Sequence, residues 1–218
     1  MSLAKCLVPF ALVATACAGG DSNTDPNPLP SVLLIQGSDM GAKFQNIDIL
    51  RGTTSVTGAM VTVNGVTMPE TNPGRYQGQL PSFLPPGAAV VLQVVAGTLA
   101  ATGQTTVPQE VTVVAPTSGA TFTRGNPISV TWTSSGNPDR FLIGLQWFSN
   151  GVGSGHQVSV AGSLRAGSIP TTTVPANATS LELFVFAYGD GTFTGAADPA
   201  SRMSLRQASV QVPVSFAP

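Results

Sequence analysis

His156 is the candidate for acid–base chemistry in this sequence, which holds one histidine. Acyl transfer through a serine or cysteine nucleophile needs a base within hydrogen-bond reach, and that base is most often histidine. His156 stands in the run GVGSGHQ at residues 151–157, which is typical of a flexible, solvated turn. No G-x-S-x-G nucleophile motif lies near it. The sequence therefore predicts a loop histidine and no catalytic residue.

The acidic residues and cysteines give no second catalytic or metal-binding cluster. The glutamates Glu70, Glu110 and Glu182 stand far apart, whereas a glycoside hydrolase needs two carboxylates flanking one bond. One histidine cannot form the His pairs of zinc sites, and both cysteines, Cys6 and Cys17, precede the body of the chain. Glycine-rich phosphate loops are absent from the sequence. We expect no metal site and no cofactor.

Aromatic residues suggest a different chemistry, because the apolar faces of aromatic rings can stack on sugar rings. In LELFVFAY, residues 181–188, one set of alternate positions is aliphatic and the other is mostly aromatic. Residues 141–148 are similarly apolar on both faces, whereas a strand in a simple sandwich buries one face. Two interpretations stay open. Either both strands are central and fully buried, or an exposed set binds a ligand through Trp147, Phe184, Phe186 and Tyr188.

Cys17 has a chemical role of another kind, which its position suggests. Lys5 precedes an apolar stretch that runs from Cys6 to Ala16 and ends in small residues, the layout of a secretory signal. The stretch is too short for a bilayer, which takes about 20 residues to cross. Residues 1–16 are therefore predicted to be a signal peptide that is cleaved before Cys17.

The segment Ala14-Thr15-Ala16-Cys17 resembles the lipobox of bacterial lipoproteins, with Ala14 where that family usually carries leucine. The resemblance implies that Cys17 receives a diacylglyceryl thioether and an N-acyl chain such as palmitate, which together anchor a protein firmly. Because Ala18 rather than aspartate follows the cysteine, the resemblance also implies sorting to the outer membrane. The alternative is a secreted protein without lipid.

Composition restricts the class of the protein. Charged residues make up 9% of the chain, against about 25% in ordinary soluble domains, and glycine and proline are abundant. Helix-forming runs are missing, so the sequence predicts an all-β fold. A net charge of −1 and scattered arginines argue against nucleic-acid binding. Residues 17–30 are polar and rich in Gly, Asn and Pro, which predicts a flexible tether.

From residue 31 onward, short apolar runs alternate with turn residues, the pattern of β-sandwiches. Asn64-Gly65 between two valines is a strong hairpin signal. The segment VTVVAPTSGATFTRGNPISVTWT, residues 111–133, resembles the opening of immunoglobulin-like and fibronectin-III-like modules, and alternation predicts that Trp132 lies in the core. The expected strands are 32–36, 44–50, 59–63, 75–80, 89–95, 105–107, 111–115, 128–133, 141–148, 157–160, 171–174, 181–188 and 209–216.

We therefore expect two tandem immunoglobulin-like β-sandwich domains, 31–108 and 109–218, after a signal peptide (1–16) and a lipidated tether (17–30). The predicted function is a non-catalytic, exported protein of the cell envelope, held at the outer membrane by lipid and acting as an interaction or spacer module. Its expected partners are the membrane and either an envelope protein or a glycan. A carbohydrate-binding surface module is the alternative, and a hydrolase built around His156 ranks third.

Overall fold

The computed structural model describes residues 31–40 and 43–217, so Cys17, the predicted signal peptide and the predicted tether lie outside the described residues. The described chain consists of strands and connecting turns, which confirms the all-β expectation. In the part of the chain described, no helix has the length and apolarity needed to cross a membrane. The strands are β1 (Leu34–Met40), β2 (Phe44–Arg51), β3 (Thr54–Ser55), β4 (Met60–Val63), β5 (Val66–Thr67), β6 (Glu70–Asn72), β7 (Arg75–Gln79), β8 (Ala89–Ala96), β9 (Leu99–Thr106), β10 (Thr112–Ala115), β11 (Ala120–Phe122), β12 (Ile128–Thr133), β13 (Arg140–Ser149), β14 (Val152–Ala161), β15 (Ala166–Ile169), β16 (Thr179–Asp190), β17 (Thr192–Gly195), β18 (Arg202–Ala208) and β19 (Val212–Phe216).

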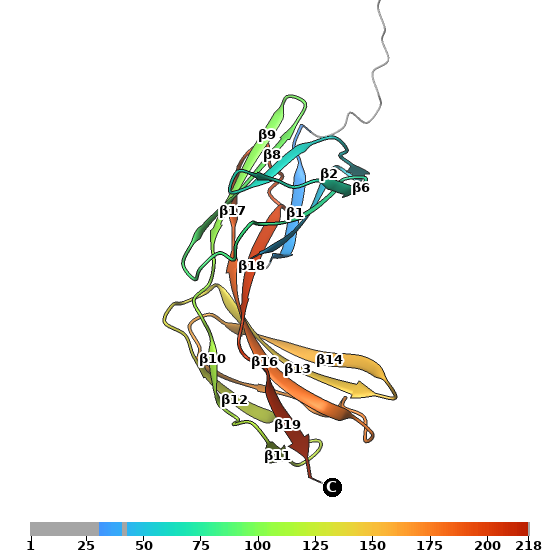
Figure 1. The fold of residues 1–218 in the computed structure, drawn as a ribbon, viewed down its shortest axis with the longest axis vertical. Coiled ribbons are helices and arrows are strands. Elements are labelled where there is room, and N and C mark those ends of the chain that lie inside the picture. Colours follow the sequence, from blue (N-terminus) through green and yellow to red (C-terminus); the bar gives the residue numbers. More distant parts are fainter. Residues whose placement is uncertain (1–30, 41–42, 218) are drawn as a thin grey trace, which may run out of the picture.

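Two immunoglobulin-like β-sandwiches stack along the long axis of a bent molecule (Figure 1). One 11-stranded sheet runs through both, in the order β11-β19-β16-β18-β1-β2-β7-β6, with β13 and β14 added beside β16 and β3 beside β2. A five-stranded sheet, β17-β9-β8-β4-β5, encloses the first core against it. A three-stranded sheet, β10-β12-β15, encloses the second core.

The strands follow the alternation of the sequence wherever one face meets a core. In β12, Ile128, Val130 and Trp132 are buried, while the residues between them are exposed, so Trp132 lies in the core as predicted. The Trp132 ring packs edge-on against Phe141 at 5.1 Å between centroids. At the predicted hairpin, Asn64 and Gly65 have φ angles of 48° and 78°, as a type I′ turn requires.

Two local expectations were wrong. Residues 152–157 are part of strand β14 and not of a flexible loop. The turn is confined to Asn150 and Gly151, whose φ angles of 52° and 78° make a second type I′-like turn between β13 and β14. The strand expected at 171–174 is a turn, closed by the Val174 amide donating to the Thr171 carbonyl. The buried Thr171 hydroxyl bonds the backbone of residues 125 and 126 and holds the segment out of the sheet.

The chain passes between the two cores three times. The sequence predicts one passage, between separate domains 31–108 and 109–218. After β16, β17 pairs with β9 and β18 pairs with β1, so Met203 and Leu205 are part of the first core. The end of β18 then pairs with β16, and β19 returns to the second core. Local patterning cannot show this exchange, because short apolar strands look alike whichever core they join.

At the junction of the sandwiches, hydrogen bonds hold the end of β16 against the start of β13, and β16 packs closely on β9. The Asp190 amide donates to Oδ2 of Asp139 at 2.7 Å, and the Asp139 amide donates to the Tyr188 carbonyl at 2.9 Å. Gly189 lies so close to β9 that a Cβ atom there would be 2.7 Å from the Thr106 carbonyl oxygen. The junction is thus packed at backbone distance, which favours a fixed arrangement of the two sandwiches.

Candidate binding face on the second sandwich

The outer face of the second sandwich is the surface of β14, β13, β16 and the end of β18 that points away from the second core. Along β16, Leu183, Val185 and Ala187 belong to the core, so the alternate residues lie on the outer face. Across the sheet these outer residues pair with β13: Phe184 with Gly144, Phe186 with Leu142, and Tyr188 with Arg140. The second set of alternate residues in 181–188, which is mostly aromatic, therefore lies on this outer face.

The aromatic row on β16 is covered by its own neighbours. Phe184 and Phe186 have ring centroids 4.7 Å apart, and Phe186 meets Tyr188 edge-on at 6.3 Å. The guanidinium of Arg206 lies 5.0 Å from the Phe186 ring centroid, and that of Arg140 lies 4.6 Å from the Tyr188 ring centroid. Such contacts over ring faces are attractive, and they leave Phe184 and Tyr188 buried.

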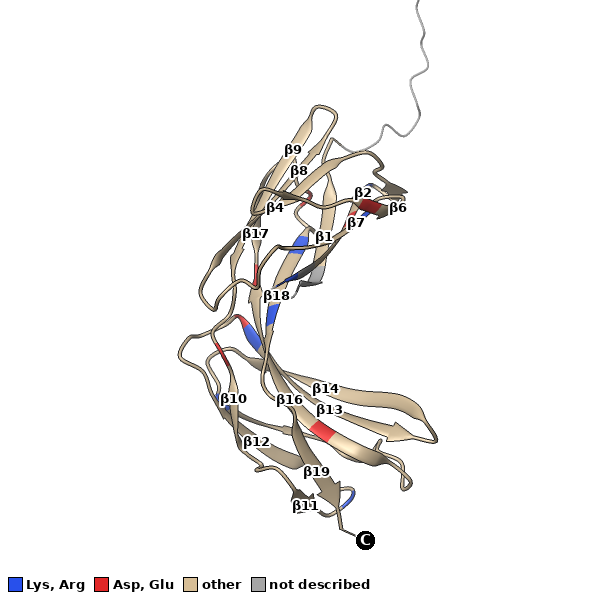
Figure 2. Ribbon diagram, in the orientation of Figure 1, with Lys and Arg blue, Asp and Glu red and all other residues tan. Residues whose placement is uncertain are grey.

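Cationic charge on this face is concentrated near the junction (Figure 2), whereas Glu182 lies toward the hairpin end. Figure 2 shows cationic positions along β18 and at the start of β13, close to the crossing strands. Arg140 forms an ion pair with Asp190, whereas Arg206 contacts the aromatic row. The aromatic row is therefore a packed aromatic and arginine layer, unlike the open platform on which a sugar would stack.

Trp147 does not belong to this face. It alternates with Phe148 along β13, lies in the second core with 5% of its surface exposed, and pairs with Ser154 of β14. The four proposed ligand-binding residues therefore do not share one surface, because Trp147 points to the side opposite Phe184, Phe186 and Tyr188. Phe148, 47% exposed, is the aromatic of β13 that lies open on the outer face.

A hollow of about 360 Å³ opens on the outer face at the far end of the β13–β14 hairpin. Its side-chain walls on this face come from Gln146, Phe148, Gln157 and Phe184, and its lining includes no Lys, Arg, Asp or Glu. Gln146 donates a hydrogen bond through Nε2 to Oε2 of Glu182. Gly153 and Gly155, both exposed, have no side chains to fill the hollow.

His156 lies on β14 and not in a loop. It pairs with Leu145 in the ladder and is half-buried on the side of the second core. Within the described residues, no hydrogen bond joins His156 to a serine or a carboxylate, and no group of three or more His, Cys, Asp or Glu residues could hold a metal ion. The geometry around His156 gives the hydrolase hypothesis no support.

No protein-family model and no curated protein sequence matches this chain. Solved structures to which it is similar include the FN1–FN3 domains of chicken CNTN1, with 18% sequence identity, 86% of this chain covered and a TM-score of 0.34. The chain covers 64% of that structure's length. The fibronectin(III)-like modules of Clostridium thermocellum CbhA give 16% identity, coverage of 85% of this chain and 95% of that one, and a TM-score of 0.25.

These neighbours are fibronectin-type modules. At such identities and TM-scores, neither structure identifies a family or a ligand for the chain. The sandwich architecture follows from the strand pairing and the two cores of the chain itself.

Sequence reasoning missed the residues that shape the hollow. Phe148, Gly153 and Gly155 escape it because the composition of residues 151–157 predicts a flexible turn, whereas these residues belong to a hairpin. The signal that could have found them is Asn150-Gly151, which stands between two β-forming runs just as Asn64-Gly65 does. Arg140 and Arg206 gave no such signal, because only the folded sheet brings them over the rings.

Proposed function

We propose that this protein is a non-catalytic, lipid-anchored module of the cell envelope, which holds an interaction surface away from the membrane. The observation that carries the proposal is the stacking of two sandwiches end to end, with β1 starting at one end of the molecule and β19 finishing at the other (Figure 1). A lipid on Cys17 would sit on the side of the first sandwich. The outer face of the second sandwich would then project outward.

The three chain passages between the cores support a spacer role. A single linker leaves two domains free to move, whereas several packed crossings resist bending. The Thr105 hydroxyl of β9 donates to the carbonyls of Gly189 and Asp190 at 3.3 and 3.4 Å, and these bonds, with the close approach of Gly189 to β9, join the sandwiches. A rod of this kind keeps its far end at a fixed distance from the start of β1, where the predicted tether would join it.

Acylation of Cys17 is tested by metabolic labelling with an alkyne fatty acid. We expect wild type to incorporate the label and to fractionate with membranes, and Cys17→Ala to lose both properties, because its side chain cannot form the thioether. The matched control is Cys6→Ala, which removes the other cysteine and should keep the label.

Mass spectrometry of the mature protein provides the decisive check. An unmodified Cys17, or a label that persists in Cys17→Ala, would refute the lipid anchor and leave only the architecture. An exported protein without lipid would then replace the anchored one.

Carbohydrate binding has less support than the interaction role. A sugar-binding platform needs exposed ring faces, and Trp147, Phe184 and Tyr188 are buried. Phe148 is exposed at the rim of the hollow, but the other phenylalanine and tryptophan rings that line the hollow are not open to solvent.

A further inference from the structure

β14 differs from the other strands at the ends of the sheets. In the described chain, the end strands β3 and β5 have two residues, β6 and β11 have three, and β10, β15 and β17 have four. β14 has ten residues and pairs only with β13. A long edge strand presents unpaired N–H and C=O groups to another chain, and short edges avoid this.

The usual protections of an edge strand are missing from β14. Its sequence, VGSGHQVSVA, has no Lys, Arg, Asp, Glu or Pro. Its pairing with β13 continues through ten residues without a bulge. Lysine, proline and bulges are the devices that natural sheets use to block edge pairing, so the edge of β14 is open to a further strand.

On the outer face beside this edge, aromatic rings lie over Gly144 and Gly153, and Gly155 is left uncovered. On β13, the Phe184 ring lies over Gly144, where a Cβ atom would be 2.1 Å from Cε2 of the ring. On β14, the atoms nearest to a Cβ atom at Gly155 would be the Leu145 carbonyl oxygen, at 3.2 Å, and Cα and Cβ of Gln146, none of which belongs to a ring. The hollow of about 360 Å³ lies at this uncovered glycine, beside Gly153, where a Cβ atom would be 3.4 Å from Cε1 of the Phe148 ring.

We propose that β14 binds an extended segment of a partner protein as an added strand, with an aromatic side chain of that segment in the hollow. The ring would cover Gly155 as Phe184 covers Gly144, between Phe148 and the end of the aromatic row. Backbone hydrogen bonds along the edge supply affinity in this mode, and pockets for alternate side chains supply specificity. The proposal deepens the interaction role proposed above and does not depend on acylation of Cys17.

Charge and side-chain size identify the occupant. Neither β14 nor the lining of the hollow has a Lys, Arg, Asp or Glu residue. The Glu182 carboxylate beside the hollow already accepts a hydrogen bond from Gln146, so an aromatic ring fills the space without the desolvation cost that a charged side chain would have there. A second copy of β14 fits poorly, because its outer positions are Gly153, Gly155, Gln157, Ser159 and Ala161, none of them aromatic. An uncharged, extended segment with aromatic residues at alternate positions matches both features.

The test uses the full chain and a fluorescent synthetic peptide of alternating tyrosine and threonine, about as long as β14. We expect saturable binding by fluorescence anisotropy, and at least about tenfold weaker binding of a peptide in which alanine replaces each tyrosine. In hydrogen exchange, the tyrosine peptide should slow exchange of amides within residues 152–160. Equal binding of the two peptides, absence of binding, or unchanged exchange in β14 would overturn the proposal.

Two matched double variants locate the site. Gln157→Lys with Ser159→Lys puts charge on exposed positions of the open edge, and should weaken peptide binding about tenfold. Ser129→Lys with Thr131→Lys makes the same kind of change on exposed positions of β12, which is paired on both sides, and should leave binding unchanged. Equal losses in the two variants would overturn the assignment, and so would concentration-dependent protection of β14 without peptide, which would indicate a second copy as the occupant.

Discussion

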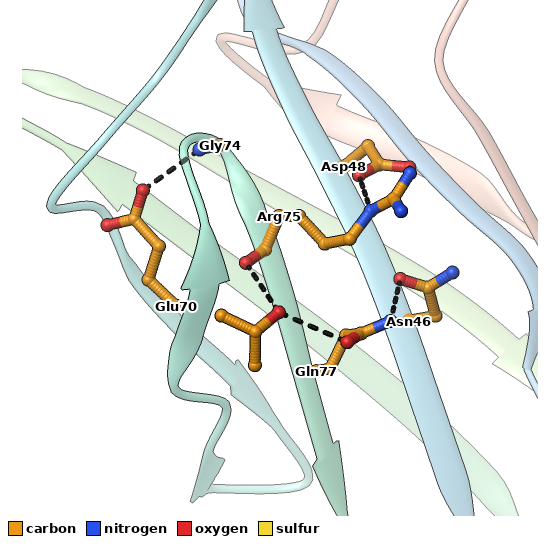
Figure 3. A network of polar contacts seen from close by, with 7 residues as sticks. Asn46, Asp48, Glu70, Gly74, Arg75 and Gln77 are labelled. Carbon is orange, nitrogen blue, oxygen red and sulfur yellow. Dashed lines mark hydrogen bonds and ion pairs between the residues drawn. The ribbon is translucent and has the colours of Figure 1, made fainter.

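Glu70 holds two turns of the first sandwich with one carboxylate. Its Oε2 accepts from the Gly58 amide at 2.8 Å, and its Oε1 accepts from the Gly74 amide at 2.9 Å. Figure 3 shows the second of these bonds beside the polar pairs Arg75–Asp48 and Gln77–Asn46 on β2 and β7. The bonds from Gly58 and then Gly74 favour the charged form and hold the pKa of Glu70 below its usual 4.5.

This depressed pKa predicts a pH-dependent stability. A carboxyl group with a lowered folded pKa contributes stability at pH values above its unfolded pKa, and that contribution is lost as pH falls through the folded pKa. Glu70→Gln should therefore lower the urea midpoint at pH 7, and the gap to wild type should narrow below pH 4.5. The control is Glu110→Gln, at an exposed glutamate. A gap that stays constant across the acid range would contradict the role given to the Glu70 charge.

At the scale of elements, the β13–β14 hairpin carries most of what is specific to the outer face. Asn150 and Gly151 accept the positive φ angles of its turn, and the ladder then fixes which side chains face the core. Because the side-chain period of a strand is two, neighbouring residues on β13 have opposite environments. Trp147 is in the core, and Phe148 is open to solvent.

Alanine substitution at these adjacent residues tests the register of the hairpin. Trp147→Ala should lower the free energy of unfolding by about 3–5 kcal/mol, because it leaves a large cavity in the second core. Phe148→Ala should change it by no more than about 0.5 kcal/mol, as is usual for a surface position. Each variant is the control for the other in denaturant unfolding. The reverse order of effects would mean that the strand is shifted by one residue.

At the scale of the whole molecule, the exchange of strands makes the two cores depend on each other. β18 pairs with β1 in the first sandwich and with β16 in the second, so one seven-residue strand stabilises both. Domains joined by one linker can unfold independently, whereas units that share a strand unfold together. The first core is complete only with Met203 and Leu205 of β18, a strand that follows β16 along the chain.

Leu205→Ala tests this coupling. The side chain is 1% exposed in the first core, and its truncation should cost about 2–5 kcal/mol. We expect a single unfolding transition at a lower midpoint and faster hydrogen exchange in β1 and in the second-core strand β16. Val210→Ala, at an 84% exposed position a few residues further on, is the control and should leave both unchanged. Faster exchange confined to the first sandwich would show that the cores are independent.

Local patterns in the sequence were enough for the all-β class, the Asn64-Gly65 hairpin and the burial of Trp132, because alternation and turn chemistry act over a few neighbouring residues. Tertiary structure decided which core each strand joins, and it placed residues 152–161 in a strand at an open edge. It also buried two rings of β16, because Phe184 packs against Gly144 of β13 and the Arg140 guanidinium lies over Tyr188. The physical reason is that pairing partners such as β18 with β1, or Arg206 with Phe186, are distant along the chain or come from different strands. Their contacts depend on how the whole chain packs, which no short window of sequence contains.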